Sequence, residues 1–129
     1  SALGAAGARG RVVALCAGVL DARVWRVVTS NSLASFLTEV PFEGQRLGIL
    51  APGIVRDVGD IPQLAALLAP RKLVIAGSVD GAGRALEQSA LDRQFEFTKR
   101  IYSIVESPSA MTISTCATAN ELIRALDRP

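Results

Sequence analysis

The stretch GDIPQLAALLAPRKLVIAGSVD, residues 59–80, decides the fold. Asp60 is a good helix N-cap, and Pro62 suits the first turn, where the missing N–H of proline costs nothing. The expected helix covers Pro62–Leu68, because the Ala-Pro pair after it disfavours helical backbone. The apolar run Leu73–Ala76 predicts a buried strand, and a loop leads from it to Asp80. A helix, a buried strand and an acidic residue at the carboxyl end of that strand are typical of an α/β protein.

The other segments alternate in the same way. Helices are expected over residues 11–20, over 33–37, from Arg84 or Leu86 to Tyr102, and from Thr118 or Asn120 onward. Strands are expected over 24–29 and 111–114, and residues 40–58 are expected to form an irregular connection with at most one helical turn. This alternation predicts parallel β-α-β units with right-handed crossovers. The expected fold is a three-layer, Rossmann-like α/β sandwich with a short, mostly parallel sheet. It has three strands, or four if residues 1–4 end one.

Length and composition narrow the class of protein. The chain has 129 residues, which predicts a single domain over 1–129, and half of them are hydrophobic. The net charge is +2, and no run of basic residues is longer than Arg71-Lys72, so no nucleic-acid partner is expected. No apolar run reaches the roughly 18 residues of a membrane span, so no membrane partner is expected. The sequence leaves the location open, and its bacterial-type composition favours a cytoplasmic one.

So thin a sheet leaves exposed strand edges, which tend to pair with further strands. We therefore expect either a homo-oligomer or a missing N-terminal half to cover one edge. In the second case this domain is the C-terminal part of a longer protein.

Asp80 is the first residue with a possible chemical role. It follows a buried strand, at the sheet edge where α/β proteins place functional groups. A carboxylate there can orient a catalytic histidine, but the chain contains no histidine. The alternative interpretation is structural: Asp80 caps or stiffens the turn before Gly81.

The N-terminal turn Ala6-Gly7-Ala8-Arg9-Gly10 is the second motif. Its small residues suit the strained strand-to-helix turn that carries a nucleophilic serine in the Gly-x-Ser-x-Gly pattern. Ala8 occupies the position of the nucleophile, and alanine cannot attack a carbonyl carbon. The turn therefore has the expected backbone without the reactive side chain.

A third motif is glycine-rich. Gly77, Gly81 and Gly83 follow a strand and precede a helix, so they are a candidate anion- or dinucleotide-binding loop. A lone motif of this kind is a weak signal. The Tyr-x-x-x-Lys pair of short-chain dehydrogenases is also missing, since Tyr102 is followed four residues later by Glu106.

No cofactor is expected as the main hypothesis, and no metal site. Zinc sites are built largely from histidine and cysteine, and this chain has no histidine and two cysteines, Cys16 and Cys116. Whether these two cysteines pair in a disulfide is left open by the sequence.

These residues together resemble the C-terminal half of an α/β-hydrolase, in the branch of acetyl xylan esterases and dienelactone-hydrolase-like proteins. The resemblance runs from the turn and helix of Gly7–Asp21 through the stretch 59–80 to the helix around 95–102, and it covers nearly the whole chain. The Ala-Pro-Arg strand followed by an aspartate is its most specific part.

The resemblance implies an ester-hydrolase ancestor, with Asp80 at the position of the triad acid. The departures are severe: Ala8 replaces the serine, Thr115-Cys116-Ala117-Thr118 stands where the family supplies its histidine, and the strands before the nucleophile turn are missing. We therefore expect a catalytically degenerate domain with a binding, assembly or structural role. The alternatives are the C-terminal half of a carboxylic-ester hydrolase that needs an N-terminal segment, and a dinucleotide-binding domain at Gly77–Gly83.

Overall fold

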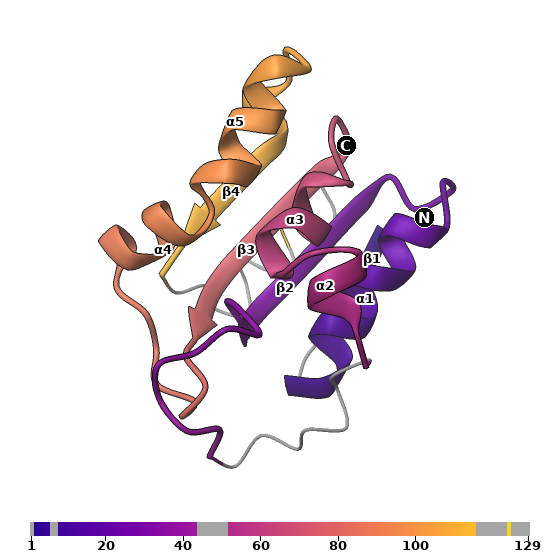
Figure 1. Ribbon diagram of the computed structural model, residues 1–129. Coiled ribbons are helices and arrows are strands. Elements are labelled where there is room, and N and C mark those ends of the chain that lie inside the picture. The colour runs from indigo at the N-terminus through magenta and orange to yellow at the C-terminus, as the bar shows by residue number, and fades with distance from the viewer. Residues whose placement is uncertain (1, 6–7, 44–51, 116–123, 125–129) are drawn as a thin grey trace.

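Four parallel strands form a single sheet in the computed structural model, which describes residues 2–5, 8–43, 52–115 and 124. The strands follow each other across the sheet in chain order (Figure 1): β1 (Ala2–Ala5), β2 (Arg26–Leu33), β3 (Lys72–Val79) and β4 (Met111–Ser114). All three pairings are parallel. The predicted α/β fold with a short parallel sheet is confirmed, and residues 2–5 supply the fourth strand.

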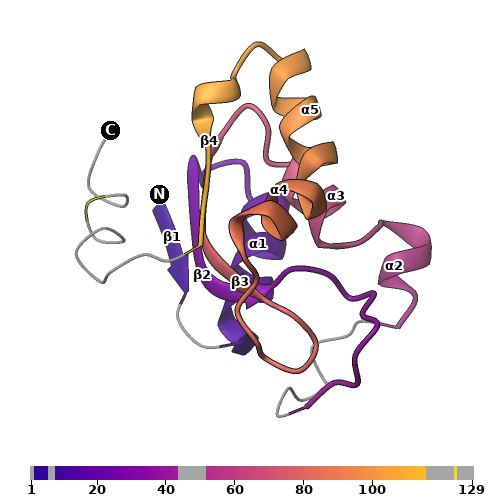
Figure 2. The ribbon, with the colours of Figure 1, turned by 90° about the vertical axis from the view of Figure 1, so that its left-hand side faces the viewer.

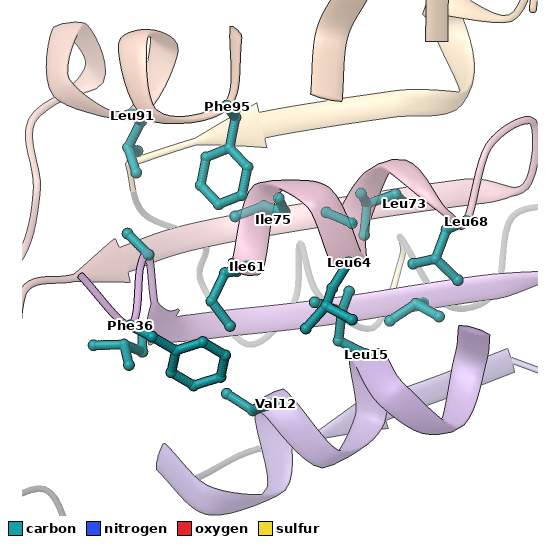
Figure 3. Packing of buried hydrophobic residues seen from close by; sticks show 14 of the residues in the cluster. Val12, Leu15, Phe36, Ile61, Leu64, Leu68, Leu73, Ile75, Leu91 and Phe95 are labelled. Carbon is teal, nitrogen blue, oxygen red and sulfur yellow. The ribbon is translucent and has the colours of Figure 1, made fainter. Parts of the chain in front are cut away.

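The helices lie together on one face of this sheet (Figure 2). They are α1 (Ala8–Leu20), α2 (Ile54–Asp57), α3 (Ile61–Ala66), α4 (Gln88–Gln94) and α5 (Glu96–Ile104), with a short 3-10 helix, η2 (Pro108–Ala110), before β4. Side chains from the helices and from the facing side of β2 and β3 form one apolar cluster (Figure 3). The helix expected after Thr118 or Asn120 falls outside the described residues, apart from Arg124.

Asp60 caps α3 as the sequence predicts. Its Oδ1 accepts a hydrogen bond from the backbone N–H of Ile61 at 2.8 Å. The Asp60 carboxylate also accepts from the backbone N–H of Gln63, and the Asp60 N–H donates to Oε1 of Gln63 at 3.0 Å, so the two residues form a capping box. The same carboxylate also accepts from the backbone N–H of Phe36 at 2.6 Å and from the hydroxyl of Ser35. Asp60 therefore both starts α3 and anchors the loop that follows β2.

Arg71 joins the end of α1 to the start of β2. Its Nη1 donates to the backbone carbonyls of Gly18 at 2.6 Å, Asp21 at 3.2 Å and Val24 at 2.8 Å. The Arg71 carbonyl in turn accepts from the buried hydroxyl of Tyr102 at 2.7 Å. Arg71 thus donates to one carbonyl in the last turn of α1 and to two carbonyls of the connection to β2, which is a structural role.

Two expected helices differ from the structure. The brief helix predicted over residues 33–37 is wrong, because β2 continues to Leu33 and the chain is then irregular to residue 43. The long helix predicted to reach Tyr102 starts only at Gln88 and is interrupted at Phe95, whose side chain is completely buried. The break lets Phe95 enter the core while α4 and α5 take different directions (Figure 1).

Candidate functional site

The carboxyl edge of the sheet holds the predicted site positions. Asp80 directly follows β3, and Ala8 begins α1 just after β1. Because β1 and β3 are parallel, both positions lie at the carboxyl ends of their strands, on the same end of the sheet. β2 lies between them. Two strand spacings separate them laterally, about 10 Å. The strand-turn-helix order expected around Ala8 is present, although the turn residues Ala6 and Gly7 lie outside the described part of the chain.

The carboxylate of Asp80 is occupied by its own loop. Its Oδ1 accepts hydrogen bonds from the backbone N–H groups of Ala82 and Arg84, both at 2.9 Å, and its Oδ2 accepts from Nε of Arg84 at 3.1 Å. The Asp80 N–H also donates to the Arg84 carbonyl at 2.9 Å, which closes the loop. The contacts that would stiffen the turn before Gly81 are therefore present.

These bonds also shift the acid strength of Asp80. The hydrogen bond from the Arg84 backbone N–H is the largest cause that lowers the pKa of this carboxyl below its usual value, and the Arg84 side chain adds to it. Both groups favour the ionised carboxylate. Asp80 is therefore held as a charged acceptor.

Asp80→Asn is expected to lower the urea midpoint at neutral pH, because asparagine keeps an acceptor for the two N–H groups but loses the charge facing Arg84. Since the pKa is lower in the folded state, the stabilisation by Asp80 is present above the unfolded pKa, about 4. It is lost as the pH falls through the lower folded pKa. Urea unfolding of the wild type and of Asp80→Asn, across the pH range in which Asp80 titrates, measures the expected difference in stability. A difference between them that does not shrink with acid would contradict the result.

The three glycines do not all lie in one loop. Gly77 lies inside β3 with φ +73°, where a Cβ atom would approach Oδ1 of Asn31 to 2.7 Å and the carbonyl oxygen of Thr115 to 2.8 Å. Gly81 is packed against Thr38, while Gly83 has φ +78° and open space around it. The expectation that all three follow the strand is wrong for Gly77: close packing between β2, β3 and the end of β4 requires this glycine.

The helix after this loop is also displaced. It starts at Gln88, five residues beyond Gly83, instead of at Arg84 or Leu86. Anion or dinucleotide binding here stays a prediction, which titration with NADH followed by fluorescence can test.

Sequence reasoning missed two polar residues near this edge. Asn31 lies in β2 with φ +48°, next to Gly77 of β3 with φ +73°, so both strands bend at the same level. Ser35 bonds Asp60 across 25 positions of sequence. The tolerance of asparagine for left-handed backbone is the one signal that could have indicated Asn31.

Two hollows on the surface of the described part of the chain lie away from Asp80. One of about 360 Å³ lies between the start of α3 and the joint of α4 and α5, and another of about 470 Å³ lies between α5 and β4. Asp80 lines neither.

Among the described residues no group of three or more His, Cys, Asp or Glu side chains could hold a metal ion, and no helix is long and apolar enough to cross a membrane. Cys16 is a free thiol there, and Cys116 lies outside the described part.

Comparison with known proteins supports the fold alone. No family model matches the chain, and no curated protein matches it. Among solved structures, the fold is similar to that of a Bacteroides fragilis protein described as a "putative acetyl xylan esterase", with a TM-score of 0.55 and 18% sequence identity. The match covers 78% of this chain but only 26% of that protein, so this chain spans about a quarter of its length. The chain therefore has a distant esterase-like α/β fold.

Proposed function

We propose that this chain is a non-catalytic α/β-hydrolase-like domain with a role in binding, assembly or structure. The observation that carries the proposal is the engagement of Asp80 by Ala82 and Arg84 of its own loop. The chain supplies no histidine for Asp80 to orient, and Ala8 stands where a serine would attack. A Ser-His-Asp triad works as a unit, so what remains without two members is at most weak catalysis by binding and oxyanion stabilisation.

Hydrolysis of p-nitrophenyl acetate tests this proposal. The purified chain is expected to release p-nitrophenol no faster than buffer does, and Asp80→Asn is expected to behave identically. An unfolded preparation of the chain serves as the control for unspecific reaction at surface side chains. Turnover well above buffer that disappears in Asp80→Asn would show a catalytic carboxylate and overturn the proposal.

A second candidate function is the C-terminal half of a carboxylic-ester hydrolase of the acetyl xylan type. Two observations favour it: the described part of β1 pairs only with β2, and the chain matches a quarter of an esterase-like protein. In this case an upstream segment supplies the serine, the histidine and further strands. A chain extended upstream that hydrolyses the ester, when the present chain does not, would favour this candidate.

A further inference from the structure

One face of the sheet carries no described helix. The described helices lie on the other face (Figure 2), where Val27 of β2 and Ile75 of β3 point into the apolar cluster. Successive side chains of a strand point to opposite sides of the sheet, so the neighbours of these two residues point to the helix-free side, here called the back face. These neighbours are Arg26 and Val28 of β2 and Val74 and Ala76 of β3.

The side chains of the back face are buried. Val28 is 3% exposed, Val74 8% and Ala76 1%, and Arg26 is completely buried. None of the three apolar side chains belongs to the cluster under the helices. A face of a sheet is buried by a layer packed on it, not by the neighbouring strands. No helix of the described part lies there, so the layer that covers the back face has to be sought among the remaining residues.

We infer that the C-terminal segment, residues 118–127, covers the back face as an amphipathic helix. Apolar residues that recur at intervals of three and four positions share one side of a helix. This segment has four such residues, Ala119, Leu122, Ile123 and Leu126. Arg124 falls on the opposite side of such a helix, and Arg124 is helical and exposed in the structure. The inference holds whether or not the chain is catalytic.

The end of β4 lies within reach of the back face. β4 is an edge strand that ends at Ser114, and β2 lies two strand spacings away, about 10 Å. The four residues 115–118 can span about 13 Å. Because the chain leaves β4 at its carboxyl end, a helix that packs on the sheet runs back toward the amino ends of the strands. Ten helical residues are about 15 Å long, close to the roughly 13 Å of β2 between Arg26 and Ser30.

Charge complementarity agrees with this direction of the helix. Arg26 begins β2, so its buried guanidinium lies at the amino end of the back face, in register with Lys72 of β3. Charged side chains are rarely buried unless a group of opposite charge is near. A helix that runs toward this end brings its partial negative charge there. It also brings Asp127, which flanks the apolar side, whereas Arg124 and Arg128 fall on the far side of the helix.

Urea unfolding of the full chain tests the inference. Ile123→Ala is expected to lower the ratio of folded to unfolded protein in water about a hundredfold, because a buried isoleucine is truncated. Alanine is the better helix former, so this loss would report lost packing. Arg124→Ala is the matched control in the same turn and is expected to change the ratio by no more than about threefold. If Ile123→Ala does not fold, Ile123→Val is expected to lower the ratio about fivefold.

A double-mutant cycle locates the contact. Val28→Ala and Ile123→Ala together are expected to lower the ratio about fivefold less than the product of their separate effects, because residues in contact are coupled. Leu64→Ala is the control for the opposite side of the sheet. Leu64 lies in α3 and is 4% exposed, so its effect and that of Ile123→Ala are expected to multiply. Ile123→Val can replace Ile123→Ala in both cycles.

Two results would overturn the inference. The first is an Ile123→Ala variant that is as stable as Arg124→Ala, because the segment then packs on nothing. The second is coupling of Ile123 to Leu64 in place of Val28, because the segment then lies on the helical face. The expected result leaves the edge at β1, and not the back face, as the surface for an upstream segment. Stability does not depend on turnover, so these outcomes are separable from those of the ester assay.

Discussion

Phe95→Ala is expected to lower the free energy of unfolding by about 4 kcal/mol. Phe95 is completely buried at the joint between α4 and α5, and its ring points from the helical layer toward β3 (Figure 3). The ring also borders a small internal cavity of about 10 Å³. Truncation would enlarge this cavity, which Ile75 of β3 and Ile61 of α3 also line.

Urea unfolding followed by circular dichroism measures this effect, and Phe97→Ala provides the matched control. Phe97 undergoes the same chemical change two residues later, but it is 44% exposed, so a loss of less than about 1 kcal/mol is expected. If Phe95→Ala does not fold, Phe95→Leu keeps most of the volume and is expected to cost about 1 kcal/mol. Similar losses for Phe95→Ala and Phe97→Ala would show that the joint is not part of the core.

Phe95 also shows why part of the fold could not be predicted. Local signals were sufficient for α3, because Asp60 and Pro62 mark its start with side chains that act within one turn. The helical pattern of residues 86–102, by contrast, continues through Phe95 without a glycine or proline. The break there comes from burial of one ring against β3, and such tertiary contacts leave no local mark in the sequence.

The candidate site, like the fold, could be predicted from the sequence only in part. The position of Asp80 after a buried strand followed from the apolar run before it. The hydrogen bonds from Arg84 to the Asp80 carboxylate depend on how the loop closes, and the sequence pattern does not predict that loop geometry. Gly77 was expected to follow the strand because the apolar run ends at Ala76, but it lies inside β3, where Asn31 and Thr115 leave no room for a side chain. The bends at Asn31 in β2 and Gly77 in β3 lie side by side, and this can be recognised only once the pairing of the two strands is known.

Asp60→Ala is expected to lower the free energy of unfolding by about 3 kcal/mol, because a helix cap and further charge-assisted hydrogen bonds are lost together. The carboxylate is buried and accepts from Ile61, Phe36 and Ser35, so two buried backbone N–H groups would lose their acceptor. The effect is therefore larger than that of a cap on an exposed helix.

Two further variants separate the functions of Asp60 in the same urea experiment. Asparagine is as good an N-cap as aspartate, so Asp60→Asn is expected to keep the bond to Ile61 and to lose only the contribution of the charge to the Ser35–Phe36 loop. Gln63→Ala removes the reciprocal half of the capping box and is expected to cost about 1 kcal/mol or less. If Asp60→Ala costs no more than Gln63→Ala, then Asp60 only caps α3, and the loop after β2 is held by other contacts.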